Sequence, residues 1–551
     1  MPFPTVVPVL IVGGGPVGLT LSIQLSAYGV PHLLVERHPG TSRHPKARGI
    51  SARSMEIFRR FGLEDAVRGA GLPAEQARFY RGRDLVDPAF ELVRPAGPPD
   101  DGPAHTPAPG AICAQDVLET VLLRRARAAA PDAVAFATRL LSFSQHPGDA
   151  AGGGGVHAVL ADRDGAAPRT VCADWLIGCD GAASTVRAGA GIAMAGPTGL
   201  GHYLSVRFEA PLGPLVTDRA SAAYFLTAAG GGGFQAVDND RMWVFQYPFD
   251  PAHTDPAALA ADHQRLTGLI RAAAGVPELA VTVRDTLPWR MDAQLADAYR
   301  ASRVLLAGDA AHVSPPTGGH GMNTGLGDVD NLAWKLAAVV AGRAGEPLLD
   351  SYQAERRPVA RRVIDVSHGN ARNRGNYRID DELLLTAQYR SSAVLPGGAA
   401  LVDGDAERPP LDPAGYRPGS TPGSRAPHLR LTGAAGASGA AGASSTLDLV
   451  GPGFTLFTRT ADPAWQRQVD TAAAAGPQVT HHRLDDGARQ LTDPADWRRL
   501  LGLPDTGALL VRPDGHIAWR APHPPAAGTE LRDALLRVLS LPSPAGPPAT
   551  G

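Results

Sequence analysis

Residues 8–37, PVLIVGGGPVGLTLSIQLSAYGVPHLLVER, predict a strand, a helix and a second strand at the start of the chain. The apolar run 9–12 is typical of a buried parallel strand. It leads into a G-x-G-x-x-G turn whose glycines are Gly13, Gly15 and Gly18. Such a turn lets a pyrophosphate approach the backbone at a helix N-terminus, where the helix dipole favours an anion. The stretch therefore predicts a parallel α/β unit with a dinucleotide site.

An acidic residue ends this predicted unit. Glu36 follows the apolar run 32–35 and lies about 20 residues beyond Gly15, where an acid accepts hydrogen bonds from a ribose diol and disfavours a 2′-phosphate. A glycine-rich turn without a ligand is the alternative, but strand, glycines, helix and acid stand here in register. The motif does not separate NAD from FAD, so that decision depends on residues further along the chain.

Composition limits the class of protein. The chain has 551 residues, enough for two or three domains, and 44% of them are hydrophobic, as in ordinary globular proteins. A net charge of −2 gives no basic field for nucleic acid, and no run approaches about 20 apolar residues, the length of a membrane span. Cys113, Cys172 and Cys179 lack the spacing of a metal site or a redox pair. We therefore expect a cytoplasmic protein with no nucleic-acid partner, no membrane segment and no metal.

The stretch 304–336, VLLAGDAAHVSPPTGGHGMNTGLGDVDNLAWKL, predicts a second part of the same site. A short apolar strand delivers Asp309 to the carboxyl end of a parallel sheet, where ligands bind. A loop rich in Pro and Gly follows, and residues 323–336 have the apolar spacing of a helix. A flat ring could lie against this turn, and the helix N-terminus would stabilise an anionic reduced ring. These features favour a flavin.

Three weaker features accompany these two stretches. Residues 37–53 are rich in Arg, Lys, His and Gly, which fits either a solvated basic loop or an electropositive lining beside a diphosphate. Gln115 precedes a predicted helix at 117–129, and Asp180 and Gly181 follow a short apolar strand. Taken alone, a glutamine at a helix start is usually solvated, and a strand that ends in Asp-Gly is commonly only a turn.

Residues 200–290 change to alternating patterns such as LSVRFEA and RMWVFQYPF, which predict a largely antiparallel sheet. Alternation places Trp243 and Phe245 on one face of their strand and directs the adjacent Tyr224 and Phe225 to opposite faces. An aromatic face can be core packing or the wall of an aromatic pocket, and for any single residue the core is favoured.

Together these motifs resemble those of a known family. GGGPVG with Glu36, CDGAAST followed by Arg187, and GDAAH with PPTGGHGMNTG are similar, in this order, to the motifs of the single-component FAD aromatic hydroxylases, the para-hydroxybenzoate and phenol hydroxylase group. The resemblance is strong over roughly residues 1–370. Within this family the chain most resembles hydroxylases that tailor polycyclic aromatic natural products, including flavoenzymes of the rebeccamycin and staurosporine pathways.

The resemblance implies an α/β fold with a Rossmann-like FAD-binding domain of the para-hydroxybenzoate hydroxylase type, a β-sheet substrate domain and a C-terminal thioredoxin-like domain. A thioredoxin-like domain without cysteines cannot exchange disulfides, so packing or contact in a homodimer is its expected role. The expected domains are a discontinuous FAD-binding domain at 1–80, 106–190 and 291–370, a substrate-binding domain at 81–105 and 191–290, a linker at 371–425 and the thioredoxin-like domain at 426–551.

The resemblance also assigns roles to single residues. Asp309 would hold the ribityl chain, and His320 and Pro316, beside the flavin ring, are the catalytic candidates. Relatives often have arginine where Lys46 stands and glutamine where His320 stands, and either Lys46 or Arg48 could be the cation that approaches the flavin. The residues expected to bind FAD are Gly13, Gly15, Pro16, Gly18, Glu36, Arg37, Lys46, Arg48, Gln115, Arg124, Asp180, Gly181, Asp309, Pro316, Gly319, Gly321, Met322 and Asn323.

The implied reaction is hydroxylation of a polycyclic aromatic intermediate of polyketide or indole type. NADPH or NADH would reduce noncovalently bound FAD, and O2 would give a flavin C4a-hydroperoxide that transfers oxygen to the ring. The substrate domain roofs the flavin in this family, so Tyr224, Arg241 and Trp243 are the expected substrate contacts. Two alternatives stay open: Baeyer–Villiger oxygen insertion on the same class of substrate, and a non-catalytic flavoprotein that binds an aromatic intermediate.

Overall fold

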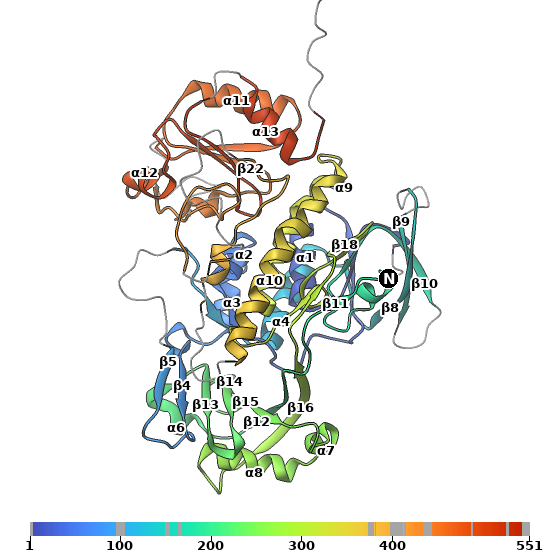
Figure 1. Cartoon of the computed structure of the whole chain (residues 1–551), viewed down its shortest axis with the longest axis vertical. Coiled ribbons are helices and arrows are strands. Elements are labelled where there is room, and N and C mark those ends of the chain that lie inside the picture. Colours follow the sequence, from blue (N-terminus) through green and yellow to red (C-terminus); the bar gives the residue numbers. More distant parts are fainter. Residues whose placement is uncertain are drawn as a thin grey trace, which may run out of the picture.

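The computed structural model of the chain has three parts that follow one another along its longest axis (Figure 1). The C-terminal part lies at one end, a central part carries the long helices, and a second sheet with its helices lies at the other end. Segments of the expected 81–105 excursion, the 371–425 linker and the 426–551 domain lie outside the described residues. The described residues are 4–94, 105–148, 155–162, 168–372, 380, 382–396, 411–412, 415–433, 444–485, 489–524 and 528–542.

A mixed sheet of eight strands forms the central part. Its main path runs through β18 (Arg300–Ala301), β19 (Val304–Leu306), β10 (Arg169–Gly178), β1 (Val6–Val12), β2 (His32–Val35) and β7 (Val134–Ala135), and β8 (Thr138–His146) and β9 (Gly155–Asp162) extend it from β10. β19, β10, β1, β2 and β7 pair in parallel. The loops that follow β1, β2, β10 and β19 therefore open at one edge, where ligands bind in such sheets.

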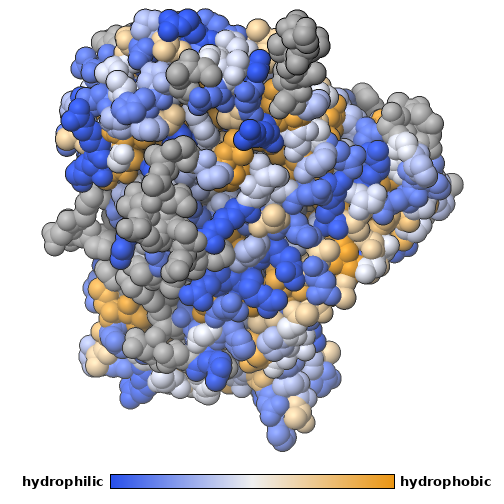
Figure 2. All heavy atoms as spheres, turned by 45° about the horizontal axis from the view of Figure 1, so that its top comes forward, coloured by the Kyte–Doolittle hydropathy of each residue, from blue (hydrophilic) through white to orange (hydrophobic). Residues whose placement is uncertain are grey.

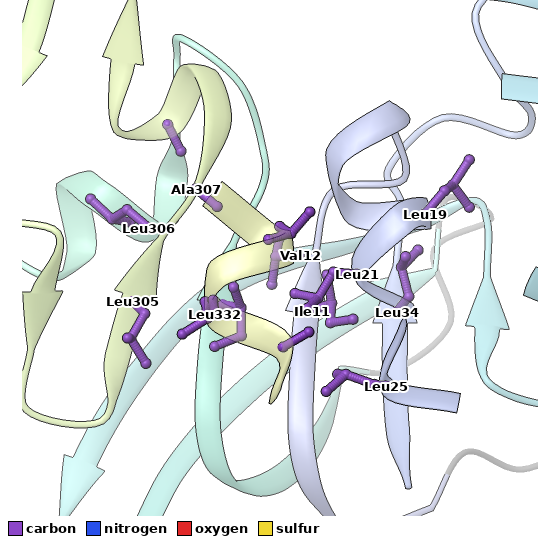
Figure 3. Packing of buried hydrophobic residues seen from close by; sticks show 14 of the residues in the cluster. Ile11, Val12, Leu19, Leu21, Leu25, Leu34, Leu305, Leu306, Ala307 and Leu332 are labelled. Carbon is purple, nitrogen blue, oxygen red and sulfur yellow. The ribbon is translucent and has the colours of Figure 1, made fainter. Parts of the chain in front are cut away.

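Helices bury the middle of this sheet. Val9, Leu10 and Ile11 of β1 are 0% exposed. The helix α1 (Pro16–Ala27) packs against α4 (Gln115–Ala129) and α9 (Gly321–Val340). Figure 3 shows Leu21 of α1 and Leu332 of α9 among the side chains of this core. Each such side chain stabilises the fold by about 1.5 to 3 kcal/mol, so the core holds the ligand edge rigidly.

Smaller elements complete the central part. The long helix α10 (Asp350–Arg372) packs against α9 (Figure 1). The others are α2 (Ala52–Arg60), α3 (Glu64–Ala70), α5 (Thr185–Gly189), the paired strands β3 (Gly49–Ile50) and β6 (Ala111–Ile112), and the sheet of β11 (Met194–Ala195), β17 (Gln294–Ala296) and β20 (His312–Val313).

The second sheet has seven strands, and all its pairs are antiparallel except one. In order they are β16 (Thr282–Met291), β12 (Gly201–Glu209), β15 (Met242–Phe249), β14 (Gly232–Ala236), β13 (Ala223–Leu226), β4 (Phe79–Gly82) and β5 (Glu91–Arg94). Side chains from α7 (Pro256–Ala261) and α8 (His263–Ala274) cover one face, and α6 (Gly213–Val216) lies after β12. The expected domain limits stay a prediction, but β4 crosses the limit drawn after residue 80.

The C-terminal part combines a βαβ unit with a β-hairpin. Its strands are β23 (Val479–Arg483), β22 (Phe454–Thr458), β25 (Ala508–Val511) and β26 (Ile517–Ala521), in this order, and its helices are α11 (Pro463–Ala474), α12 (Ala495–Leu501) and α13 (Glu530–Val538). β21 (Leu431–Gly433) and β24 (Arg489–Leu491) form a separate pair. β22 and β23 are parallel, and the other two strands follow antiparallel, which is a thioredoxin-like arrangement. The expected α/β fold class is confirmed.

The surface and the helices bear on the expected absence of a membrane segment. Hydrophilic residues predominate on the face shown in Figure 2, with smaller hydrophobic areas between them. Among the described residues, no helix is both long enough and apolar enough to cross a bilayer.

Buried charges join the C-terminal part to the central part. Glu355 on α10 accepts hydrogen bonds from Lys335 Nζ on α9 (2.7 Å) and from Arg512 Nη1, just after β25 (2.6 Å). All three side chains are 0% exposed. Burial alone would raise the pKa of Glu355, but the charges of Arg512 and Lys335 outweigh it and hold the pKa far below its usual range. Glu355 is therefore ionised, and the C-terminal part supplies some of its countercharge.

Arg512→Met should lower the free energy of unfolding by about 3 to 5 kcal/mol, because it leaves a buried carboxylate with too little countercharge. Urea denaturation followed by tryptophan fluorescence measures the change. The matched control is Arg499→Met, because Arg499 pairs with Asp496 at an exposed site of the same part and should matter little. Equal losses from the two substitutions would contradict the prediction.

Candidate functional site

Packing demands glycine at two positions of the turn after β1. Gly13 has φ +111°, and a Cβ there would lie 2.3 Å from the carbonyl oxygen of Cys179. A Cβ on Gly18 would lie 2.0 Å from the carbonyl oxygen of Gly13, so helix and turn touch there. A Cβ on Gly15 would meet nothing within 4 Å, and Pro16 begins α1 beside it. The turn is therefore closed toward the protein and open at the helix N-terminus.

The carboxylate of Glu36 is fixed at the end of β2. The N–H of Gly14 donates to its Oε2 (2.7 Å), and the N–H of His38 donates to its Oε1 (2.8 Å). Each oxygen keeps a further lone pair, so both could still accept from a ribose hydroxyl. Arg37, the next residue, is exposed, and its Nε donates to the ring of His38 (3.3 Å).

Asp309 lies at the same edge of the sheet. It lies in the short 3₁₀ turn Gly308–Ala310 that follows β19. Its side chain is reached by solvent, yet the surrounding protein raises the pKa of the carboxyl by desolvation, against the opposing charges of His312 and Lys46. Its carboxyl therefore stands at the edge where ligands bind in such sheets.

The structure distinguishes the two candidate cations. Arg48 is only 8% exposed, and its terminal nitrogens donate to the carbonyl oxygens of Ala222 (2.9 Å) and Ala236 in the second sheet. Burial lowers the pKa of Arg48 to about 10, which leaves it charged at neutral pH. Lys46 is exposed, and its charge acts on Asp309. Arg48 thus docks the two parts of the protein, and Lys46 is the cation whose charge reaches Asp309.

Two residues of α4 are expected to bind FAD: one holds a neighbouring loop, and the other is exposed. Gln115 holds the 37–53 segment, because its Oε1 accepts from the N–H of Ala47 (3.2 Å) and its own N–H donates to Ala47 O (2.9 Å). Its Nε2 donates to Glu119 Oε1 (2.7 Å). Arg124 lies further along the helix and is exposed. Gln115 therefore holds the loop that carries Lys46.

Asp180 holds the start of the helix that follows it. Its carboxylate accepts from the hydroxyl of Ser184 and from the N–H of Val186 (3.1 Å) at the start of α5. Gly181 has φ +81°, and a Cβ there would meet nothing within 4 Å. The loop after β10 thus leaves its backbone uncovered at Gly181, while the Asp180 side chain holds the loop.

The loop before α9 also leaves backbone groups uncovered. Pro316 and Gly319 are exposed, and the N–H groups of Gly321 and Met322 lie in the first turn of α9, where no intrahelical acceptor exists. Asn323 fastens this loop, because its Oδ1 accepts from Ser51 N–H (2.9 Å) and its Nδ2 donates to Gly49 O (2.9 Å) and Gly319 O (2.7 Å). The helix start can therefore face a flat ring with its backbone.

His320 is buried beside this loop. It is 2% exposed, and burial lowers its pKa to about 4, although Asp380 opposes the shift. At neutral pH the imidazole is therefore uncharged. Its role as a residue beside the ring stays a prediction.

Two expected substrate contacts lie in the core instead. Tyr224 and Trp243 are 0% exposed and pack with side chains of α7 and α8. Trp243 Nε1 donates to Asp240 O (3.2 Å). Their assignment to the pocket was wrong, because helices cover the face on which alternation places them. Arg241 is exposed and forms a surface ion pair with Glu209 (2.9 Å).

The opposite face of this sheet turns toward the central part. His44 Nε2, from the 37–53 segment, lies 2.7 Å from Ser205 Oγ on β12. On the same face, Tyr203 and Trp289 stack with ring centroids 4.5 Å apart and 12° between their planes. Trp289 Nε1 donates to Gln246 Oε1 (3.1 Å). Sequence reasoning missed these half-buried residues, although the alternation that it used also defines this face.

Comparison with known proteins decides what this site holds. A family model described as a FAD binding domain matches residues 6–367. A second, described as the C-terminal domain of aromatic-ring hydroxylases, matches residues 419–542. The chain belongs to the FAD-dependent aromatic-ring hydroxylases. It is a flavoprotein monooxygenase, and the family, the fold and FAD inferred from the sequence are confirmed.

Relatives match this hydroxylase along nearly its whole length. A putative polyketide hydroxylase of Streptomyces halstedii is 40% identical over 560 residues, with 97% of each chain covered. The tetracenomycin A2 monooxygenase-dioxygenase of Streptomyces glaucescens is 38% identical over 570 residues, again with 97% of each chain covered. The crystal structure of aklavinone-11 hydroxylase with FAD and aklavinone has a TM-score of 0.83 at 34% identity, covering 97% of this chain and 99% of that one.

The residues fit FAD. Gly15, Gly181 and Gly319 belong to three different loops, and a Cβ on any of them would meet nothing within 4 Å. These loops follow β1, follow β10 and precede α9, so open space lies along the edge where Asp309 also stands. The site thus provides an anion-binding helix start, acceptors for hydroxyls and a backbone platform for a ring.

Trp243→Ala should lower the free energy of unfolding by about 3 to 5 kcal/mol, because it removes a buried ring from the core. It should leave the change in the flavin spectrum on addition of an aromatic ligand intact. Trp289→Ala is the matched variant on the opposite face, and it should show the reverse pattern. Thermal melting and flavin difference spectra measure both, and a weaker ligand response in Trp243→Ala alone would return that residue to the pocket.

Acid should destabilise the protein partly through His320. The folded-state pKa of about 4 lies below the ordinary 6.5, so the unfolded chain binds more protons between these values and stability falls as pH drops through this window. From pH 7 to 5 the loss is about 2 kcal/mol for this group. Urea unfolding at pH 7, 6 and 5 should show a shallower pH dependence in His320→Gln. If the free energy of unfolding falls equally with pH in the wild type and in His320→Gln, the low pKa assigned to His320 is refuted.

Proposed function

We propose that this enzyme hydroxylates a polycyclic aromatic intermediate of natural-product biosynthesis with FAD, O2 and NADPH or NADH. The observation that carries the proposal is end-to-end similarity to a tetracenomycin monooxygenase-dioxygenase and to an aklavinone hydroxylase solved with aklavinone. The stacked rings of Tyr203 and Trp289 support it, because they give the sheet a flat aromatic surface on the side of the central part.

The chain's own residues would hold the cofactor along the edge of the parallel sheet. The N-terminus of α1 and the open side of Gly15 suit the pyrophosphate, and Glu36 suits the adenosine ribose. Asp309 would accept from a ribityl hydroxyl, and Lys46 would balance the phosphate charge. Bound FAD supplies the redox chemistry that activates oxygen. The protein supplies position, charge and exclusion of water.

The sheet would orient the substrate. Gln246 Nε2 donates to Ser205 Oγ (2.9 Å), and its Oε1 accepts from Trp289 Nε1 (3.1 Å), so the amide orientation is fixed. Oε1 keeps one lone pair, which can accept from a substrate hydroxyl. A ring laid on Trp289 would then present a chosen edge to the cofactor, and such positioning accounts for much of the rate in oxygen transfer.

We further propose that FAD is held without a covalent bond, that the enzyme works in the cytoplasm and that it forms a homodimer. The first is supported by the burial of His320, which is 2% exposed. The second is supported by Cys113, Cys172 and Cys179, which are free thiols as in a reducing compartment. Acid precipitation, which separates noncovalent flavin from protein, and light scattering test the first and third.

The decisive experiment uses the purified holoenzyme with NADPH or NADH, ¹⁸O2 and a panel of polycyclic phenols and quinones. A product that gains one labelled oxygen as a phenolic hydroxyl, with nicotinamide oxidation coupled to it, supports the proposal. A labelled lactone would establish Baeyer–Villiger insertion instead. A yellow protein that oxidises no nicotinamide with any aromatic present would be a binding protein.

Lys46→Met should raise the Kd for FAD about tenfold, because it removes the cation whose charge reaches Asp309. Flavin fluorescence during titration of the apoprotein measures this change. Arg48→Met is the matched control: its guanidinium is taken up by two carbonyl oxygens, so its loss should lower the melting temperature more than the FAD affinity. If Arg48→Met weakens FAD binding and Lys46→Met does not, Arg48 is the cation that binds the cofactor.

A further inference from the structure

Asp328 on α9 holds the turn that carries Asp309. Its Oδ2 accepts from the N–H of Gly308 (3.1 Å) and lies 2.7 Å from His312 Nε2. The carboxylate therefore binds the residue just before Asp309 and a residue just after it. The side chains of Asp328 and His312 are 0% and 1% exposed, so this contact is fully buried.

Arg356 on α10 in turn fixes Asp328. Its Nε donates to Asp328 Oδ1 (2.9 Å), and its Nη2 donates to the carbonyl oxygen of Thr324 (3.0 Å). Its Nη1 donates to the hydroxyl of Tyr389 (2.9 Å). A Cβ on Gly327 would lie 2.9 Å from Nη2, so α9 has room for the guanidinium because glycine stands there. Each arm of this guanidinium has one partner.

Tyr389 is held by the C-terminal part. Its ring stacks on His516, in the turn between β25 and β26, with centroids 4.0 Å apart and 24° between the planes. Its N–H donates to Gly423 O (2.9 Å), and the N–H of Gly423 donates to Ile517 O (2.7 Å) on β26. Tyr389 is 3% exposed. The hairpin of the C-terminal part thus sets the position of this phenol.

We propose that the C-terminal domain is part of the cofactor-binding machinery, and that Tyr389 and Arg356 are positioning residues that act through Asp328 on the turn of Asp309. The inference depends on the proposed role of Asp309 in binding FAD. The path from β26 to Asp309 consists of hydrogen bonds and one ring stack, all buried, where such contacts are stronger than in water. It gives a function in cofactor retention to a domain without cysteines.

The test measures FAD binding to Tyr389→Phe, which keeps the stacked ring and removes only the hydroxyl. The Kd of the apoprotein for FAD should rise about two- to thirtyfold, with faster release of flavin. Tyr416→Phe is the matched control, because the Tyr416 hydroxyl also accepts from a buried arginine, Arg425 Nη1 (2.8 Å), but that arginine leads to Glu56. Its Kd should stay within about twofold of the wild type, while its melting temperature falls comparably.

A double-mutant cycle tests the route. If Tyr389 acts through the turn of Asp309, Tyr389→Phe should add little to the Kd already raised by Asp309→Asn. Arg356→Lys is a second variant in case Tyr389→Phe does not fold, since lysine cannot bind Asp328, Thr324 and Tyr389 together. An unchanged Kd in Tyr389→Phe, additive effects, or an equal rise in Tyr416→Phe would overturn the proposal.

The measurement also separates this proposal from the proposed function. FAD affinity is measured without substrate or nicotinamide, so a negative hydroxylation assay does not bear on it. A wild-type Kd in Asp309→Asn would remove Asp309 from the site and overturn the route with it, while hydroxylation by the wild-type enzyme would still stand.

Discussion

The burial of α9 on all sides is the constraint on which the rest of the structure depends. Its apolar residues face the central sheet, but Asp328, Asp330, Asn331 and Lys335 are buried as well, each 2% exposed or less. Buried charges cost several kcal/mol unless they are paired. Partners therefore come from α2, α10 and the C-terminal domain, and the same contacts fix the N-terminus of α9 at the proposed flavin site.

What could be predicted from the sequence was local. The apolar strands at 9–12 and 304–306, and the roles of Gly13 and Gly18, follow from neighbouring residues, because tight packing leaves no room for a Cβ. Asp309 could be placed at the sheet edge because it comes three residues after the end of a short buried strand. Site residues delivered by a strand end are therefore accessible to sequence reasoning, and their ligands follow from the family.

What could not be predicted depends on contacts between distant segments. Alternation showed that Tyr224 and Phe225 point to opposite faces, but only α7 and α8 determine which face is core. Arg48 has the same surroundings in sequence as Lys46, yet its partners lie on the other sheet. The polar face of α9 has the pattern of a solvated surface, and its buried partners come from residues far along the chain.

The ion pairs of Glu355 also have a consequence for the order of synthesis. Lys335 and Glu355 leave the ribosome well before Arg512, so a nascent chain reaches a stage at which the central part is nearly complete but lacks this countercharge. Domains generally fold as they emerge, and unfinished ones expose surfaces that aggregate. The buried carboxylate of Glu355 therefore gains its full countercharge only after the hairpin that follows Arg512 has left the ribosome.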